Sequence, residues 1–120
     1  MPSHEEFWND DCKRFIERII KANKEIFVLS ALIDKQMCGY DVIKEIFLKY
    51  NVLLGQGSVY PILYTLEEEG ILQAEYIKGD MRSKNYCFTP KGREISQNEI
   101  EAFTNAMDRV RSLIEFELYV

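Results

Sequence analysis

The polar face of one predicted helix carries side chains that could contact nucleic acid. Tyr60 and Tyr64 lie one turn apart on this face, where a solvent-exposed helix would usually carry Lys, Glu and Gln. Their hydroxyls could donate to phosphate and their rings could contact thymine methyls, while the helix N-terminus attracts phosphate. Packing of one or both rings against a neighbouring element is equally compatible with the spacing. The candidate DNA contacts on this helix are Gln56, Ser58, Tyr60, Tyr64 and Thr65.

A basic segment follows in a predicted β-hairpin. Residues 76–93 contain five basic residues and a single acidic one. Lys78, Arg82 and Lys84 could lie along a phosphate backbone or enter a minor groove, where they would release counterions from the DNA. The alternative is a solvated hairpin whose cations prevent edge-to-edge aggregation. The charge imbalance favours contact with DNA.

Residues suited to catalysis form no recognisable site. The one histidine, His4, stands near the N-terminus, and the sequence has no Gly-rich phosphate loop, nucleophile elbow or paired metal-ligand motif. The carboxylates at positions 67–69 are interpreted as a solvated face. We therefore expect no enzymatic activity, no metal and no other cofactor.

The cysteines and the N-terminal segment indicate a cytoplasmic protein. Three cysteines without CxxC spacing predict neither a disulfide framework nor a zinc site. Residues 1–11 are acidic and do not resemble a signal peptide, and the apolar runs are too short to cross a membrane. The expected localisation is the cytoplasm.

Capping residues and apolar periodicity predict four helices before the hairpin. Ser3 and Ser58 are suitable N-caps for the first and the fourth helix, and Gly70 is a suitable left-handed C-cap. Pro61 is placed in the first turn of the fourth helix, where its missing N–H is harmless. The predicted helices cover residues 3–23, 24–34, 39–50 and 58–69.

An extended pattern replaces the helical one after Gly70, and a last helix begins at Pro90. Strands 71–78 and 85–89 would form the hairpin, with residues 79–83 between them. This order predicts an α+β fold, mainly α, in which a winged helix-turn-helix uses residues 58–69 as recognition helix and 71–89 as wing. The expected organisation is an N-terminal helix over 1–23, a DNA-binding domain over 24–93 and a C-terminal helix over 94–120.

The net charge of −5 over 120 residues argues against a widely basic surface. Residues 93–120 hold three basic and six acidic residues, so much of the acidity lies outside the hairpin. We expect weak non-specific affinity for DNA and a binding face made of two small patches, the recognition helix and the wing.

Four short segments between residues 26 and 93 form a combined pattern. They read CGYDVI at 38–43, GSVYP at 57–61, LEEEGIL at 66–72 and YCFTPKGR at 86–93. In this order they resemble the PadR family of winged-helix transcriptional regulators. The resemblance implies a homodimeric transcription factor, often a repressor, that binds a pseudo-palindromic operator with its recognition helices in adjacent major grooves and its wings on the flanking DNA.

The resemblance also implies that the first and last helices build the dimer interface. The last helix has apolar residues at alternating steps of three and four, as in a coiled coil, and the first has a broad apolar stripe. Some relatives bind aromatic molecules between the subunits, which would place an aromatic effector near Trp8, Phe15, Phe103 and Met107, although plain dimer core is the favoured interpretation. The expected interface residues are Phe7, Trp8, Phe15, Ile19, Ile100, Phe103, Met107, Val110 and Ile114.

This sequence departs from the family pattern at three positions. Cys38 stands where histidine is common, which is compatible with a thiol sensor, although inert packing is favoured. Tyr64 and Thr65 stand where arginine is frequent, so DNA affinity would depend more on the wing. The leading hypothesis is a dimeric DNA-binding regulator. The alternatives are a winged helix that binds another protein and a sensor of aromatic ligands.

Overall fold

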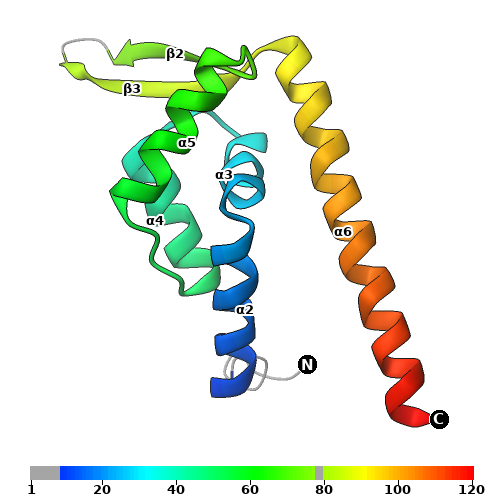
Figure 1. The fold of residues 1–120 in the computed structure, drawn as a ribbon. Helices are drawn as coiled ribbons and strands as arrows, with labels where there is room; N and C mark the ends of the chain where they lie inside the picture. Colours follow the sequence, from blue (N-terminus) through cyan, green and yellow to red (C-terminus); the bar gives the residue numbers. More distant parts are fainter. Residues whose placement is uncertain (1–8, 78–79) are drawn as a thin grey trace.

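The computed structural model describes residues 9–77 and 80–120, apart from the side chains of 77 and 80–83. Five helices and a three-stranded antiparallel sheet make up this part of the chain, so the predicted fold class is confirmed (Figure 1). The elements are α2 (Asp10–Ala22), α3 (Lys24–Ile33), β1 (Met37–Cys38), α4 (Gly39–Tyr50), α5 (Gln56–Glu68), β2 (Leu72–Ile77), β3 (Asp80–Phe88) and α6 (Pro90–Tyr119).

The core lies where α3, α4 and α5 meet the inner face of the sheet. Val28, Ile46, Leu63 and Tyr86 supply one fully buried side chain from each of these four elements. The strands are ordered β1-β3-β2, and β1 places Met37 opposite Tyr86. Sequence reasoning missed β1, because two residues are too few to show an alternating pattern.

The first described helix begins later than predicted. The backbone of Asn9 is extended, with ψ of 165°, and its side chain accepts a hydrogen bond of 2.8 Å from the Cys12 amide. Asn9 is therefore the N-cap of α2, and the prediction of one helix running from Ser3 through this position was wrong. The proposed cap Ser3 lies outside the described residues.

Helix α5 begins two residues before the predicted N-cap. Gly55 is the cap, and Ser58 lies inside the first turn, with its amide 3.1 Å from the Gly55 carbonyl. Pro61 consequently lies in the second turn, where it has no N–H to give to the Gly57 carbonyl. The assignments of Ser58 as cap and of Pro61 to the first turn were wrong, because a glycine without side-chain donors or acceptors starts this helix.

The C-terminal end of α5 follows the prediction. Gly70 has a φ of 75°, and the amides of Gly70 and Ile71 donate to the carbonyls of Glu67 and Leu66 at 3.1 and 3.0 Å. This is a Schellman motif, which reverses the chain into β2. The second strand of the hairpin is longer than expected, because β3 starts at Asp80 and not at residue 85. The pairing shifts between Tyr76 and Ile77, so a bulge takes up part of the predicted link.

The start of α6 is fixed to the start of β2. The Thr89 hydroxyl donates to the Gly70 carbonyl at 2.7 Å and accepts from the Gly92 amide at 2.9 Å, which makes Thr89 the N-cap of α6. Gly92 is buried, and a Cβ built on it would overlap the Ile71 carbonyl. Arg93 adds a hydrogen bond of 3.0 Å to the carbonyl of Ile33 at the end of α3.

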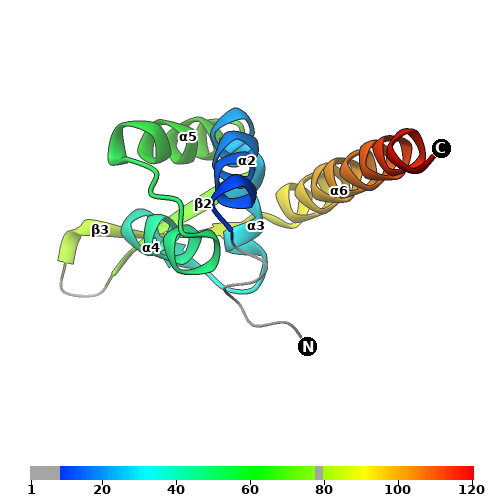
Figure 2. The same ribbon diagram turned by 90° about the horizontal axis from the view of Figure 1, so that it is seen from below.

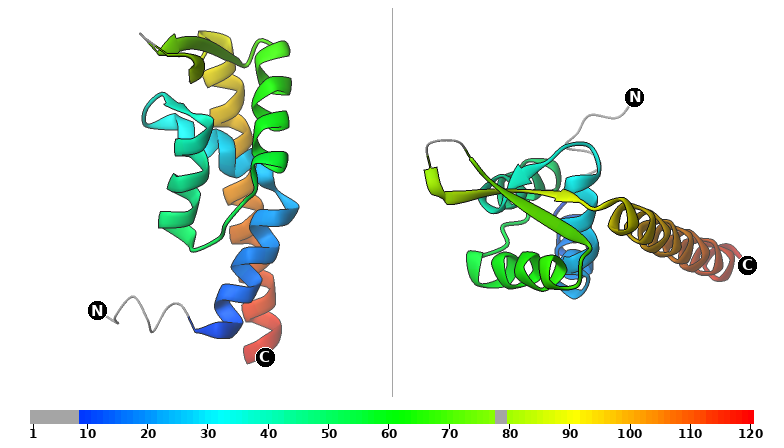
Figure 3. Two further views of the ribbon diagram at one scale, coloured as in Figure 1. Left: turned by 90° about the vertical axis from the view of Figure 1, so that its left-hand side faces the viewer. Right: turned by 90° about the horizontal axis from the view of Figure 1, so that it is seen from above.

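Helix α6 leaves the core as it proceeds. Ile100 packs against the core, and the Phe103 ring meets Phe27 edge to face at 5.8 Å between centroids. Beyond that contact the side chains of α6 are exposed, and the helix extends away from strands β2 and β3 (Figures 2 and 3). Ser96, on the inner face of α6, is fully buried, and its hydroxyl has no partner among the described residues.

No helix in the described part combines the length and apolarity needed to cross a membrane.

Gly92→Ala is expected to lower the free energy of unfolding by about 2–3 kcal/mol, because the new methyl group would collide with the Ile71 carbonyl. Urea unfolding followed by circular dichroism measures the change. Gly57→Ala is the matched control, since a Cβ on this helical residue would meet nothing within 4 Å and alanine should stabilise by up to about 1 kcal/mol. Equal losses in both variants would contradict the close contact at Gly92.

Candidate nucleic-acid interface

Helix α5 lies beside the hairpin (Figure 1), and one of its faces is exposed. Its opposite face, with Leu63 at the centre, is buried in the core. Tyr64 is 49% exposed, which is compatible with contact to a macromolecule. Three predicted contacts are exposed on this helix, namely Gln56, Tyr64 and Thr65.

Tyr60 is used mainly for packing. Its ring lies against the first residue of α4, so that a Cβ built on Gly39 would come 2.6 Å from the Tyr60 Cε1 atom. Burial raises the pKa of the Tyr60 hydroxyl, and the half-buried Cys38 adds to this effect. The close approach explains why glycine begins α4. Of the two alternatives for the tyrosines, packing applies to Tyr60, whereas Tyr64 stays accessible.

The N-terminal turn of α5 is near a cation that sequence reasoning missed. The Lys24 Nζ atom, from the start of α3, lies 3.3 Å from the Ser58 Oγ atom. Helix α5 itself has no basic residue between Gln56 and Glu68, and its cap Gly55 makes no side-chain hydrogen bond to the first turn. A hydroxyl and an ammonium therefore meet at the first turn of α5, which is chemistry suited to phosphate. Lys24 and Ser58 are 34 residues apart, so no local pattern reveals this pairing.

Lys84 is surrounded by partners from two elements. Its Nζ atom lies 3.5 Å from the Glu67 Oε1 atom and 5.7 and 5.8 Å from the ring centroids of Tyr64 and Tyr76. We call these four residues the Lys84 cluster. The interpretation of the carboxylates at 67–69 as a solvated face was wrong for Glu67, which is half-buried and paired, while Glu68 is exposed.

Tyr86 lies beneath the Lys84 cluster. Burial raises its pKa to about 12, and the negative charge of Glu67 contributes to the same shift. The Tyr86 hydroxyl therefore stays protonated at neutral pH, and the carboxylate above it is matched by the Lys84 ammonium.

Several predicted site residues lie outside the described part. Lys78, Phe7 and Trp8 are among the residues left undescribed, and Arg82 belongs to β3 without a described side chain. Their proposed contacts stay predictions.

Some of the residues expected at a dimer interface pack within the chain, and others are exposed. Ile100 and Phe103 pack within the chain and Ile19 is half-buried. Phe15 is 55% exposed, and the guanidinium groups of Arg14 and Arg18 lie 5.7 and 5.6 Å from its ring centroid. The more distal positions of the seam are exposed, namely Met107, Val110 and Ile114.

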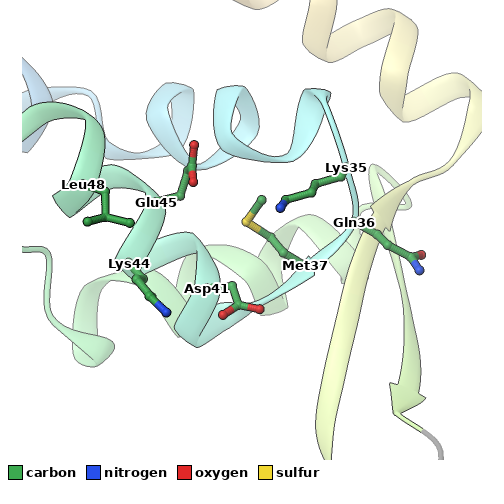
Figure 4. A pocket seen from close by; sticks show the side chains of 7 residues that line it. All are labelled: Lys35, Gln36, Met37, Asp41, Lys44, Glu45 and Leu48. Atoms are coloured by element: carbon green, nitrogen blue, oxygen red, sulfur yellow. The ribbon is translucent and has the colours of Figure 1, made fainter.

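A depression lies between the link after α3 and the exposed side of α4. Its volume is about 270 Å³ (Figure 4). Two lysines and two carboxylates share its lining, so the charges balance and select no ligand class. The lining residues are Lys35, Gln36, Met37, Asp41, Lys44, Glu45 and Leu48. No group of three His, Cys, Asp or Glu side chains in the described ranges could hold a metal.

The arrangement of α3, α4, α5 and hairpin has known counterparts. The model of the family described as "Transcriptional regulator PadR-like family" matches residues 28–98, from α3 into α6. The chain belongs to the PadR-like family. Members of this family are transcriptional regulators and not enzymes.

Solved structures with the same fold include PadR-family regulators. The one from Eggerthella lenta has a TM-score of 0.70 at 22% identity and covers 88% of this chain and 94% of that one. A transcriptional regulator from Clostridium thermocellum has a TM-score of 0.67 at 21% identity, with 79% and 93% covered. A 37.1 kDa protein in transposon TN4556 of Streptomyces fradiae is 33% identical over 86 residues, which are 72% of this chain and 24% of that protein. The match thus spans about a quarter of the length of this relative.

Tyr86→Phe is expected to reduce the alkaline sensitivity of this PadR-like protein. The pKa of Tyr86 is about 12 in the folded state and near 10 when unfolded, so its contribution is complete below pH 10 and is lost as the pH rises to 12. The loss amounts to at most about 2–3 kcal/mol. Urea unfolding from pH 9 to 12 measures it, with the exposed Tyr119→Phe as control. An unchanged pH profile for Tyr86→Phe would contradict this account.

Proposed function

We propose that this PadR-like protein is a homodimeric repressor that binds a pseudo-palindromic DNA operator. The observation that carries the proposal is the exposed face of α5, which stands beside a β-hairpin in the arrangement of a winged helix. Family membership supports regulation of transcription, while the dimer, the repressor role and the operator are proposals.

In this proposal α5 enters the major groove. Tyr64 and Thr65, which are exposed in the middle of the helix, read base edges, and Gln56 adds a contact at its exposed N-terminal end. Ser58 and Lys24, at the first turn, hold a phosphate and fix the register of the helix. The wing residues Lys78 and Arg82 contact the flanking backbone.

The second copy covers the outer part of α6. Met107, Val110 and Ile114 repeat at coiled-coil spacing and are exposed in the protomer, which favours a self-complementary helix contact. Phe7, Trp8 and Phe15 from the N-terminal segment would extend this surface. Two-fold symmetry then separates the half-sites by about 34 Å, one turn of DNA. The family resemblance also implies an aromatic effector between the subunits, although plain dimer core is the favoured interpretation.

A protein-binding winged helix is the second candidate. The absence of basic residues from Gln56 to Glu68, together with the net charge of −5, favours it. Such a surface would repel the phosphates of any DNA sequence, so the two candidates differ most clearly at low salt.

Lys24→Met and Arg82→Gln are each expected to reduce the salt dependence of DNA binding. Each removes one phosphate contact, so the slope of log K against log salt should flatten by about one unit. Fluorescence anisotropy between 50 and 200 mM salt measures the slope with a duplex that the protein selects from a random pool. Lys49→Met is the control, because Lys49 pairs with Glu45 within α4 and belongs to neither proposed phosphate contact. No binding by the wild type at 50 mM salt would favour the protein-contact candidate.

Val110→Glu combined with Ile114→Glu is expected to give a folded monomer. These side chains are 53% and 60% exposed in the protomer, so the fold should persist while like charges oppose the helix contact. Sedimentation equilibrium measures the mass and circular dichroism the helix content. The control is Asn105→Glu with Ser112→Glu, on the face of α6 opposite the seam. A monomeric wild type, or a dimer that survives the first pair of substitutions, would contradict the interface.

A further inference from the structure

We propose that Lys84 is a positioning residue, which ties the hairpin to the recognition helix instead of binding a DNA phosphate. The inference rests on the proposed DNA-binding function for its effect on affinity. The tie itself is a property of the protein without DNA.

The geometry of the Lys84 cluster joins α5 to both strands of the hairpin. Glu67 and Tyr64 lie one turn apart on α5, Tyr76 lies on β2, and Lys84 lies on β3 directly opposite Tyr76. One ammonium group therefore contacts a carboxylate and a ring of the helix as well as a ring of the neighbouring strand, all at the distances given above.

The charges in the cluster oppose a direct phosphate contact. Lys84 is already neutralised by Glu67, and both side chains are about one-third exposed. A phosphate that approached the ammonium would also meet the Glu67 carboxylate, and the repulsion would offset the attraction. Removing Lys84 should consequently leave the number of released counterions unchanged.

The Lys84 contacts supplement a short covalent connection between α5 and the hairpin. Between the end of α5 and the start of β2 the chain has only residues 69–71, with Gly70 in the left-handed conformation. Beyond this turn, Lys84 bridges the helix and the hairpin on the exposed side. It thereby fixes the angle between the surface meant for the major groove and the surface meant for the flanking backbone, and it holds Tyr64 at its place on the helix.

A double-mutant cycle without DNA tests the tie. Glu67→Gln and Lys84→Met should each raise the unfolding equilibrium constant about fivefold in urea, and the double variant should raise it little further, because both substitutions break the same contact. Glu45→Gln and Lys49→Met provide the matched control, an exposed pair within α4 whose coupling should stay below about twofold. Additive effects of the Glu67 and Lys84 substitutions would overturn the tie.

DNA binding separates positioning from phosphate contact. Lys84→Met should weaken binding to the selected duplex about five- to tenfold with an unchanged salt slope. Lys84→Arg should bind the duplex as the wild type does, because it keeps the positive charge. Glu67→Gln should weaken binding as Lys84→Met does. A slope that flattens by about one unit in Lys84→Met, with tighter binding by Glu67→Gln, would overturn the proposal. If the wild type binds no duplex, the DNA-binding function fails, and the cycle alone decides whether the tie exists.

Discussion

The hydrogen bonds of the Thr89 hydroxyl hold together the three segments on which the functional surface depends. It donates to the carbonyl of Gly70 at the end of α5 and accepts from the amide of Gly92 in α6. Gly92 lies directly on Ile71, and Leu72 pairs with Phe88, so the two ends of the hairpin close at the same point. The recognition helix, the hairpin and the long helix thus share one joint, which holds the start of the long helix against the end of the recognition helix.

Two of the cations near this joint contact other parts of the protein and so help to hold its elements in place. The Lys84 ammonium faces Glu67, and the guanidinium of Arg93 caps the end of α3 while it lies 5.5 Å from the Phe88 ring centroid. Two of the five basic residues in the segment 76–93 are therefore occupied within the protein. In the proposed complex with DNA, a protein with a net charge of −5 and two of these cations already paired should depend on shape and base contacts for its selectivity.

The sequence predicted the helical core well, because periodicity and caps are local signals. The bounds of α3 and α4 and the left-handed Gly70 agree with prediction. The failures have local causes too: Asn9 interrupts the first helix, and Gly55 displaces Ser58 as cap of α5. The pairings of Lys84 with Glu67 and of Lys24 with Ser58 join residues 17 and 34 positions apart, so only the fold reveals them.

Because α6 is long and held at its N-terminal end only, a small rotation there moves its C-terminal end by a large distance. Thirty residues make a rod of about 45 Å, of which only the first half touches the body of the protomer. A tilt of about 5° at Gly92 would move the far end by about 4 Å. The buried Ser96 hydroxyl has no hydrogen-bond partner among the described residues, so none of them resists such a tilt through a directional bond to it. In the proposed dimer, small repacking under α6 would therefore change the distance between the two recognition helices without any change within either one.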